Sequence, residues 1–249
     1  MKIIAGFICL LIGTLLLRAS YDFPDWADPQ SPASSHVSSY YLENSLKDSE
    51  VPNVVSAVLA DYRSMDTMWE TSVVLIAAIA IIFLIRRSSY EEDYRGKHKG
   101  EVPRENLIIA TTVKLTIPII VLFAFYVLIH GHHSPGGGFQ GGVILGATLI
   151  LHSLAFGLQE TMKFWTEVRL RFYSYLGVII FFAVGVSCLF LGYNFLEYAA
   201  FSEIFPVSIP WARSLSILVV ELGIALTVMA VMFSIYADLS SAGDLDKGL

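Results

Sequence analysis

The segment KLTIPIIVLFAFYVLIHGHHSPGGGFQGGVILGATLILHSLAFG, residues 114–157, decides the fold. It holds two apolar runs separated by a glycine-rich stretch at 130–142. With their flanking residues these runs cover 106–129 and 140–157, and each can cross a hydrocarbon core of about 30 Å as a helix. Pro135 has no backbone N–H and therefore ends the first helix. The segment predicts two membrane-spanning helices joined by a tight glycine-rich turn.

The composition of the whole chain agrees with a membrane protein. The chain has 249 residues, of which 55% are hydrophobic and 15% are charged, with a mean hydropathy of +0.63. Soluble domains carry about 25% charged residues, so this chain has too little charge to keep its surface in water. The net charge of −6 excludes the basic surface of a nucleic-acid-binding protein. Cys9 and Cys188 lie inside apolar runs, which supports neither a disulfide framework nor a thiolate zinc site.

Six apolar stretches predict an all-α, multi-pass transmembrane protein with six spans. The first is short and resembles a signal peptide, but Arg18 stands where a cleavage site needs small residues, so a retained helix is favoured. The stretches cover residues 3–17, 67–85, 106–129, 140–157, 172–192 and 212–236.

The distribution of lysine and arginine predicts the orientation. The connections at 86–105 and 158–171 are rich in basic residues, whereas 19–66 has two basic residues against eight acids. Because basic loops remain in the cytoplasm, the first two segments are predicted to lie inside and 19–66 outside. Both termini are then cytoplasmic, in a multi-pass protein of the cell membrane.

The same charge pattern divides the chain. We expect a two-span module at 1–87, a charged cytoplasmic linker at 88–105 and a four-span module at 106–249. Residues 20–50 are rich in Ser, Pro, Asp and Tyr and are expected to be irregular. Residues 52–65 have the apolar spacing of a short helix at the membrane surface.

In the first module, Pro52 suits the first turn of the short helix. Asp66 and Thr67 offer N-caps for the second span.

The glycine-rich turn has two interpretations. Gly136, Gly138 and Gly141 formally satisfy a G-x-G-x-x-G nucleotide motif, but that motif must follow a strand, and here it follows a membrane helix. Gly138, Gly142 and Gly146 instead lie four apart and make a smooth stripe that lets helix backbones approach closely. We therefore assign a structural role to this turn and stripe: Pro135, Gly136, Gly137, Gly138, Gly141, Gly142 and Gly146.

Histidines flank the same turn. His130, His132 and His133 lack the spacing of a known metal site and have no Cys or carboxylate nearby, so no metal is predicted. They either cap the preceding helix and bond to exposed carbonyls, or His130 and His132 relay protons at the membrane surface.

Four ionisable groups lie at membrane depth, where charge is costly and usually functional. They are Glu70, Lys114, His152 and Glu221. Glu70 has the alternative role of a favourable acid at a helix N-terminus. His152 has the alternative role of a neutral, hydrogen-bonded core residue. Glu221 has no charged neighbour in sequence, so its partner must come from another span or another chain.

Lys114 also has two interpretations. It either snorkels to the interface or joins a polar cluster around the carbonyl of residue 114 that Pro118 leaves without a helical donor.

Residues 114–157 resemble the B subunits of the multisubunit Mrp or Mnh sodium/proton antiporters. That family has a basic residue, a proline four positions on, and an H-G-H-x-x-P-G-G-G-F-x-G-G loop, which Lys114, Pro118 and 130–142 match. The last span carries the family's E-x-G at Glu221 and Gly223, and the resemblance covers about 140 residues.

Residues 53–70 are similar to the C-terminal end of the large A subunits of these antiporters and to the stand-alone counterpart of that segment in membrane-bound hydrogenases. The matching residues are Asn53, Asp61, Arg63, Asp66, Thr67 and Glu70. Met65 and Met68–Trp69 depart from the pattern. The chain thus resembles a fusion of two small subunits.

The resemblance implies a non-catalytic membrane subunit of a Na⁺/H⁺ antiporter complex. It implies partners among other membrane subunits and the lipid bilayer, no nucleic acid, no covalently bound cofactor, and transported Na⁺ and H⁺. Glu70, Lys114, His152 and Glu221 are then candidates for the ion pathway or charge coupling, and Asp61 and Asp66 for cation attraction at the outer face. Two alternatives stay open: the same module inside a redox-driven complex such as a membrane-bound hydrogenase, and a purely structural subunit.

Overall fold

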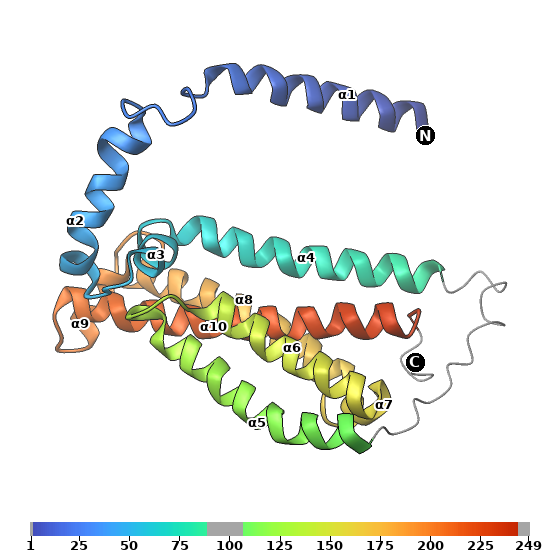
Figure 1. Cartoon of the computed structure of the whole chain (residues 1–249). Coiled ribbons are helices and arrows are strands. Elements are labelled where there is room, and N and C mark those ends of the chain that lie inside the picture. Colours follow the sequence, from blue (N-terminus) through green and yellow to red (C-terminus); the bar gives the residue numbers. More distant parts are fainter. Residues whose placement is uncertain (1, 89–106, 244–249) are drawn as a thin grey trace. The chain divides into compact units, whose positions relative to one another are not determined.

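The computed structural model describes residues 2–88 and 107–243, and every element in these ranges is helical (Figure 1). Six of the helices are long and apolar enough to cross a membrane, which confirms the predicted all-α, multi-pass fold. The predicted linker at 88–105 lies almost entirely outside the described residues. The chain divides into two compact units, residues 1–44 and 45–249.

The first unit contains one long helix. α1 (Lys2–Ala19) carries charged residues only at its ends, Lys2 and Arg18, and is followed by the short helices η1 (Ser20–Asp22) and η2 (Ala33–Val37). Its candidate span, Ile3–Asp22, has none of its residues buried within the protein. A helix that is apolar on nearly all sides is expected to lie in lipid or among other helices.

The second unit is a bundle of five spans. α10 is the centre of this bundle, because 67% of its span is buried, against 17–28% for the other four. It packs most extensively on α8 and α6, then on α4, and α6 also pairs with α5. The five spans are α4 (Ser64–Ser88), α5 (Leu107–Ile129), α6 (Gly138–Phe156), α8 (Glu167–Phe190) and α10 (Ile209–Ser240).

Short helices close the two ends of the bundle, as Figure 1 shows. One end, predicted to be external and here called the outer end, has α3 (Val54–Ala57), η3 (Val58–Tyr62), η4 (His130–His132), η5 (Tyr198–Ala200) and α9 (Phe201–Ile204). The opposite inner end has α7 (Leu158–Phe164).

Residues 38–66 differ from the sequence expectation in three details. Residues 38–49 form α2 (Ser38–Ser49) instead of an irregular segment. The N-cap of α3 is Asn53, which accepts from the amide of Val55, so Pro52 lies outside that helix. α4 begins at Ser64, ahead of the two N-caps expected for it.

Tertiary contacts explain the helix that composition did not predict. In the part of α2 that belongs to the second unit, Ser45 and Ser49 are buried, and the hydroxyl of Ser49 donates to the carbonyl of Ser45 within the helix. Tyr62 donates to Asp48 at 2.7 Å. Such contacts stabilise a helix whose own residues are weak helix formers.

The turn between α5 and α6 depends on glycine. The amide of Gly137 donates to the carbonyl of Val127 at 3.1 Å, folding the loop back on α5. A Cβ at Gly136 would lie 2.5 Å from that carbonyl oxygen, and Gly137 has a φ of +123°, which L side chains rarely adopt. The tight hairpin expected from the sequence is therefore present.

The stripe of glycines on α6 faces α10, whereas the predicted hairpin pairs α6 with α5. A Cβ at Gly138 would lie 2.0 Å from the carbonyl oxygen of Glu221, and one at Gly142 would lie 2.8 Å from that of Ala225. Gly146 continues the line against Met229 and Met232. On the α5 side the close contact belongs to Gly141, which lies against Ala124 and Leu128.

Candidate functional site

The strongest candidate site surrounds Glu221, in the outer half of α10. This residue lies twelve positions after the start of the helix, or about 18 Å along its axis, and it is 5% exposed. Its backbone contacts Gly138, and its Oε1 lies over Gly137 at the N-terminus of α6. A side chain at Gly137 would meet the carboxyl group and one at Gly138 would meet the backbone of Glu221, so the two glycines leave room for this residue at the helix end.

The carboxyl group of Glu221 has no cation partner among the described residues, and its buried Oε2 accepts no hydrogen bond there. The hydroxyl of Ser56 lies beside this carboxyl group and donates to the carbonyl of Gly131 at 2.7 Å. Burial of a carboxylate without a partner costs several kcal/mol. The group is thus placed where gain or loss of one proton has a large energetic effect on its surroundings.

Asn53 connects the N-terminal module to the glycine-rich loop. Its side-chain amide donates to the carbonyls of Gly131 and Ser134 at 2.8 and 2.9 Å and to the hydroxyl of Ser56 at 3.1 Å. Its backbone amide donates to the carbonyl of His132 at 2.9 Å. These bonds hold α3 against the loop that contacts Glu221, so both modules build the site.

The acids at the outer end differ from one another in their surroundings. Asp61 is buried and forms an ion pair with Arg213 of α10 at 2.8 Å. Burial raises the pKa of Asp61 above its usual value, although Arg213 partly offsets the rise. Asp66 is exposed and pairs with Arg63, and Glu70 is also exposed.

The candidate histidines of the loop do not form one cluster. The ring of His130 is exposed and stacks on Tyr126 with centroids 4.3 Å apart. His132 has a buried Nε2 without a hydrogen-bond partner in the described part of the chain. Within the described residues no group of three His, Cys, Asp or Glu side chains is arranged to hold a metal ion.

Lys114 and His152 lie together in the inner half of the bundle, apart from Glu221. Both line a cleft between α5, α6 and α7. His152 shares a hydrogen bond of 2.8 Å with Thr161, as a hydrogen-bonded core histidine does. The ammonium of Lys114 is exposed and lies 5.5 Å from the centre of the Phe156 ring.

Part of the polar cluster considered for Lys114 is a local bond inside α5. Thr116 donates to the carbonyl of Thr112 at 2.8 Å, four residues earlier in α5.

An ion-pair cluster that the sequence did not predict lies at the inner end. Arg86 of α4 makes two bonds to Asp238 of α10, at 2.6 and 3.2 Å, and a third to Glu167 of α8 at 2.8 Å. Arg86 was interpreted only as an orientation signal. The sequence did contain a signal for this cluster. Asp238 lies in the last turn of an apolar span, where an acid needs a cation from another part of the protein.

Comparison with known proteins identifies two regions of this chain. Residues 108–234 match a family described as a domain related to the MnhB subunit of the Na⁺/H⁺ antiporter, and residues 7–96 match the MbhE family, a subunit of the complex abbreviated MBH. These matches confirm the resemblance of both modules. The module boundaries at 87 and 106 stay predictions.

Similar curated proteins carry antiporter names. A putative antiporter subunit mnhB2 of Staphylococcus aureus is 31% identical over 55% of this chain and 96% of its own length. A probable A/B subunit of a K⁺/H⁺ antiporter of Rhizobium meliloti is 26% identical over 81% of this chain. This chain spans only 22% of the length of that Rhizobium protein.

Two solved structures share the fold. A chain of the membrane-bound sulfane sulfur reductase, an archaeal respiratory membrane complex, superposes with a TM-score of 0.66 and 26% identity. That match covers 96% of this chain and 97% of the other. A chain of the Mrp complex from Dietzia gives a TM-score of 0.63 at 22% identity, over 94% of this chain and 25% of the other, which indicates a shared fold alone.

Proposed function

Because this chain belongs to the family of domains related to the MnhB subunit of Na⁺/H⁺ antiporters, we propose that it is a non-catalytic membrane subunit of a multisubunit monovalent cation/proton antiporter. Other membrane subunits are its partners, Na⁺ and H⁺ are the transported ions, and no cofactor is covalently bound. The almost completely apolar α1 supports an assembly with further chains or lipid.

The observation that carries this proposal is the isolated carboxyl group of Glu221. It is buried in the middle of the bundle, has no cation partner in the described ranges, and lies beside backbone that glycine keeps open. We propose that its protonation and deprotonation are coupled to cation passage. Lys114 and His152 lie in a separate cleft. Any contribution of these two residues to ion transport is therefore made at a second position along the ion path.

The test replaces Glu221 by Gln in the assembled complex. Glu221→Gln keeps the size of the side chain but cannot exchange a proton, so we expect proton exchange driven by Na⁺ in vesicles to fall by at least about tenfold. Glu203→Gln is the matched control, because Glu203 is exposed at the outer end and bonds to Tyr193. The vesicle assay is run with Na⁺ and with K⁺, which identifies the cation.

The outcome separates transport from assembly. Normal exchange by Glu221→Gln in an intact complex would remove this residue from the path. Loss of the complex itself, seen by gel filtration, would favour a purely structural role for this chain.

A second candidate function has its own supporting observation. The match to the sulfane sulfur reductase chain covers nearly all of both chains, whereas the antiporter A/B protein is more than four times longer than the part it shares with this chain. The same module would then belong to a redox-driven ion pump whose redox centres lie in other chains. Identification of the chains that co-purify with this one decides between the two functions. Iron–sulfur proteins favour the redox complex, and large antiporter subunits favour the plain antiporter.

A further inference from the structure

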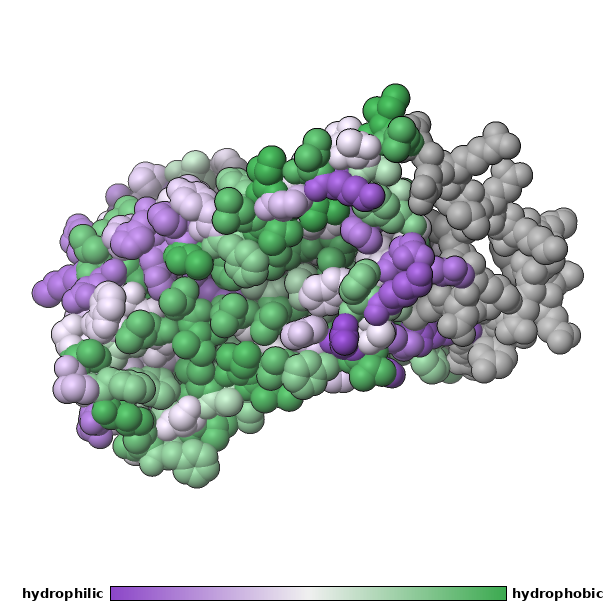
Figure 2. Space-filling view, turned by 90° about the horizontal axis from the view of Figure 1, so that it is seen from below, coloured by the Kyte–Doolittle hydropathy of each residue, from purple (hydrophilic) through white to green (hydrophobic). Residues whose placement is uncertain are grey.

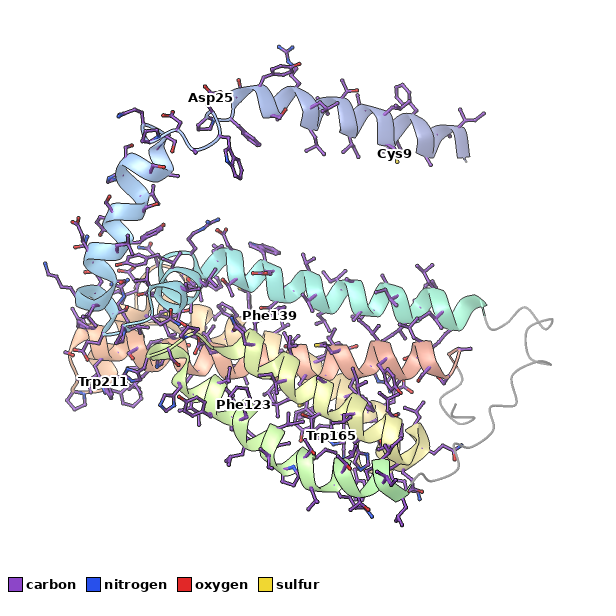
Figure 3. The ribbon with its side chains drawn as sticks, viewed as in Figure 1. Cys9, Asp25, Phe123, Phe139, Trp165 and Trp211 are labelled. Atoms are coloured by element: carbon purple, nitrogen blue, oxygen red, sulfur yellow. The ribbon has the colours of Figure 1, made fainter. Side chains whose placement is uncertain are left out.

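A long apolar cleft runs along α5. It has a volume of about 530 Å³ and is lined by α5, α6, α7, α8 and α10. Residues lining it extend from Ile117 to Leu128 on α5, with Leu222 and Met229 on α10 opposite. Figure 3 labels Trp165, which lines the cleft near the inner end.

The cleft continues into a second hollow at its inner mouth. That hollow has a volume of about 400 Å³, shares Ile117, His152 and Phe164 with the main cleft, and is lined by Lys114. From Lys114 to Leu128 the helix rises about 21 Å. The combined cleft is thus longer than one leaflet of a hydrocarbon core, which is about 15 Å thick.

The polar groups of this cleft are concentrated at one end. Thr148 donates to the carbonyl of Ile144, and His152 and Thr161 bond to each other, so these side chains are satisfied within the protein. Lys114 is different, since it forms no ion pair with any described residue. Among the described residues, the cleft therefore offers an apolar channel with a single available cation at its mouth.

The surroundings of the mouth favour an anion. Glu160 lies at the mouth but bonds to Lys163 one turn later, so its charge is compensated. The long side chain of Lys114 reaches from its position two turns into α5 toward the level of the lipid headgroups. Figure 2 shows hydrophobic residues over the middle of one face of the protein and hydrophilic residues gathered toward its ends, as expected of a surface in contact with lipid.

We propose that this cleft binds an anionic glycerophospholipid from the inner leaflet, with an acyl chain along α5 and the phosphate on Lys114. An amphiphile with one charged end matches a cleft whose available charge lies at one end. Basic pockets between membrane helices on the cytoplasmic side commonly hold acidic lipid headgroups. A partner helix in the same place would need a carboxylate at the depth of Lys114 and apolar residues beyond it. This proposal does not depend on the transport function.

The experiment measures lipid that stays bound to the full-length chain. The protein is reconstituted with phosphatidylcholine and phosphatidylglycerol, extracted in mild detergent and examined by native mass spectrometry. We expect one retained phosphatidylglycerol per chain. Lys114→Ala should reduce retention about fivefold, the size of one lysine–anionic lipid attraction, and Lys114→Arg should preserve it.

Two matched pairs of variants make the test specific. Leu222→Trp fills the cleft and should abolish retention, whereas Val219→Trp, equally exposed one turn earlier on α10 but outside the lining, should not. Arg171→Ala removes an exposed cation at the same end that does not line the cleft, and should leave retention unchanged.

Two results would overturn the proposal. One is equal lipid retention by Lys114→Ala and wild type, both monodisperse in gel filtration. The other is a partner chain that cross-links to position 222 in the purified complex with no lipid retained.

Discussion

Two buried acids on the same helix, Glu221 and Asp238, have opposite surroundings. Asp238 is 1% exposed and receives two bonds from Arg86 of the N-terminal module. Glu221 is 5% exposed and has glycine backbone as its neighbour. A buried acid with a bound cation joins two helices, whereas one without a cation stays free to change its protonation state. The same helix therefore has a structural acid at its inner end and a candidate functional acid in its outer half.

The largest expected effect tests the close backbone contact at Glu221. Gly138→Ala places a Cβ 2.0 Å from the carbonyl oxygen of Glu221, so α6 and α10 must separate. We expect a loss of more than about 3 kcal/mol of stability or failure to fold, measured by thermal unfolding in detergent. Gly13→Ala is the control and should be neutral, because a Cβ at Gly13 would meet no described atom within 4 Å. Equal stability of the two variants would contradict the close packing of α6 on α10.

The next effect tests the pairing of Asp238. Arg86→Ala leaves a buried carboxylate without its cation and should destabilise the protein by about 3 kcal/mol. Arg63→Ala removes a cation from an exposed pair and should cost less than about 1 kcal/mol. Adding Asp238→Asn to Arg86→Ala should recover much of the lost stability. If the stability changes of the two substitutions were strictly additive, the ion pair would have no coupling energy.

A smaller effect compares the two acids directly. Asp238→Asn weakens the bonds from Arg86 and should cost about 2 kcal/mol. Glu221→Gln loses no ion pair within the described residues and removes a buried charge that has no cation there, so it should not destabilise the protein. Thermal unfolding of both variants, side by side, checks this order, and a reversed order would mean that Glu221 has the structural role.

The smallest effect concerns a third acid, Asp61, whose cation only partly offsets burial. Because the folded pKa of Asp61 is raised above its usual value of 3.8, the folded state holds the proton more tightly than the unfolded state. Stability should therefore fall as pH rises from that value through the folded pKa. Arg213→Gln should raise this pKa further and extend the decline to higher pH.

Unfolding temperature measured against pH checks the prediction for Asp61. Arg63→Gln, in the exposed pair with Asp66, is the control and should leave the profile unchanged. A profile that Arg213→Gln does not alter would mean that the ion pair contributes nothing to the titration of Asp61.

Several features were predictable because they depend on local sequence. Span length follows from runs of apolar residues, since a helix in lipid must satisfy its own backbone hydrogen bonds. The turn at Gly136 and Gly137 was predictable because proline and glycine act on the backbone where they stand. The depth of Glu221 followed from counting along its span.

Other features depend on residues far apart in the chain. Arg86 and Asp238 are 152 positions apart, and each has an ordinary local explanation, so their pairing was not foreseen. The helix at Ser38–Ser49 has a polar composition typical of loops, and contacts such as Tyr62 with Asp48 stabilise it.

The amino-acid sequence by itself determined that this protein has six stretches long and apolar enough to cross a membrane, that glycine shapes its third-to-fourth connection, and which acids lie within those stretches. Those properties arise from hydropathy and backbone chemistry, which act over a few turns of helix. Only the tertiary structure decided which acid is neutralised and which is not, because a partner cation comes from whichever helix packs alongside. For the same reason it was the packing of α6 on α10 that placed the glycines beside Glu221.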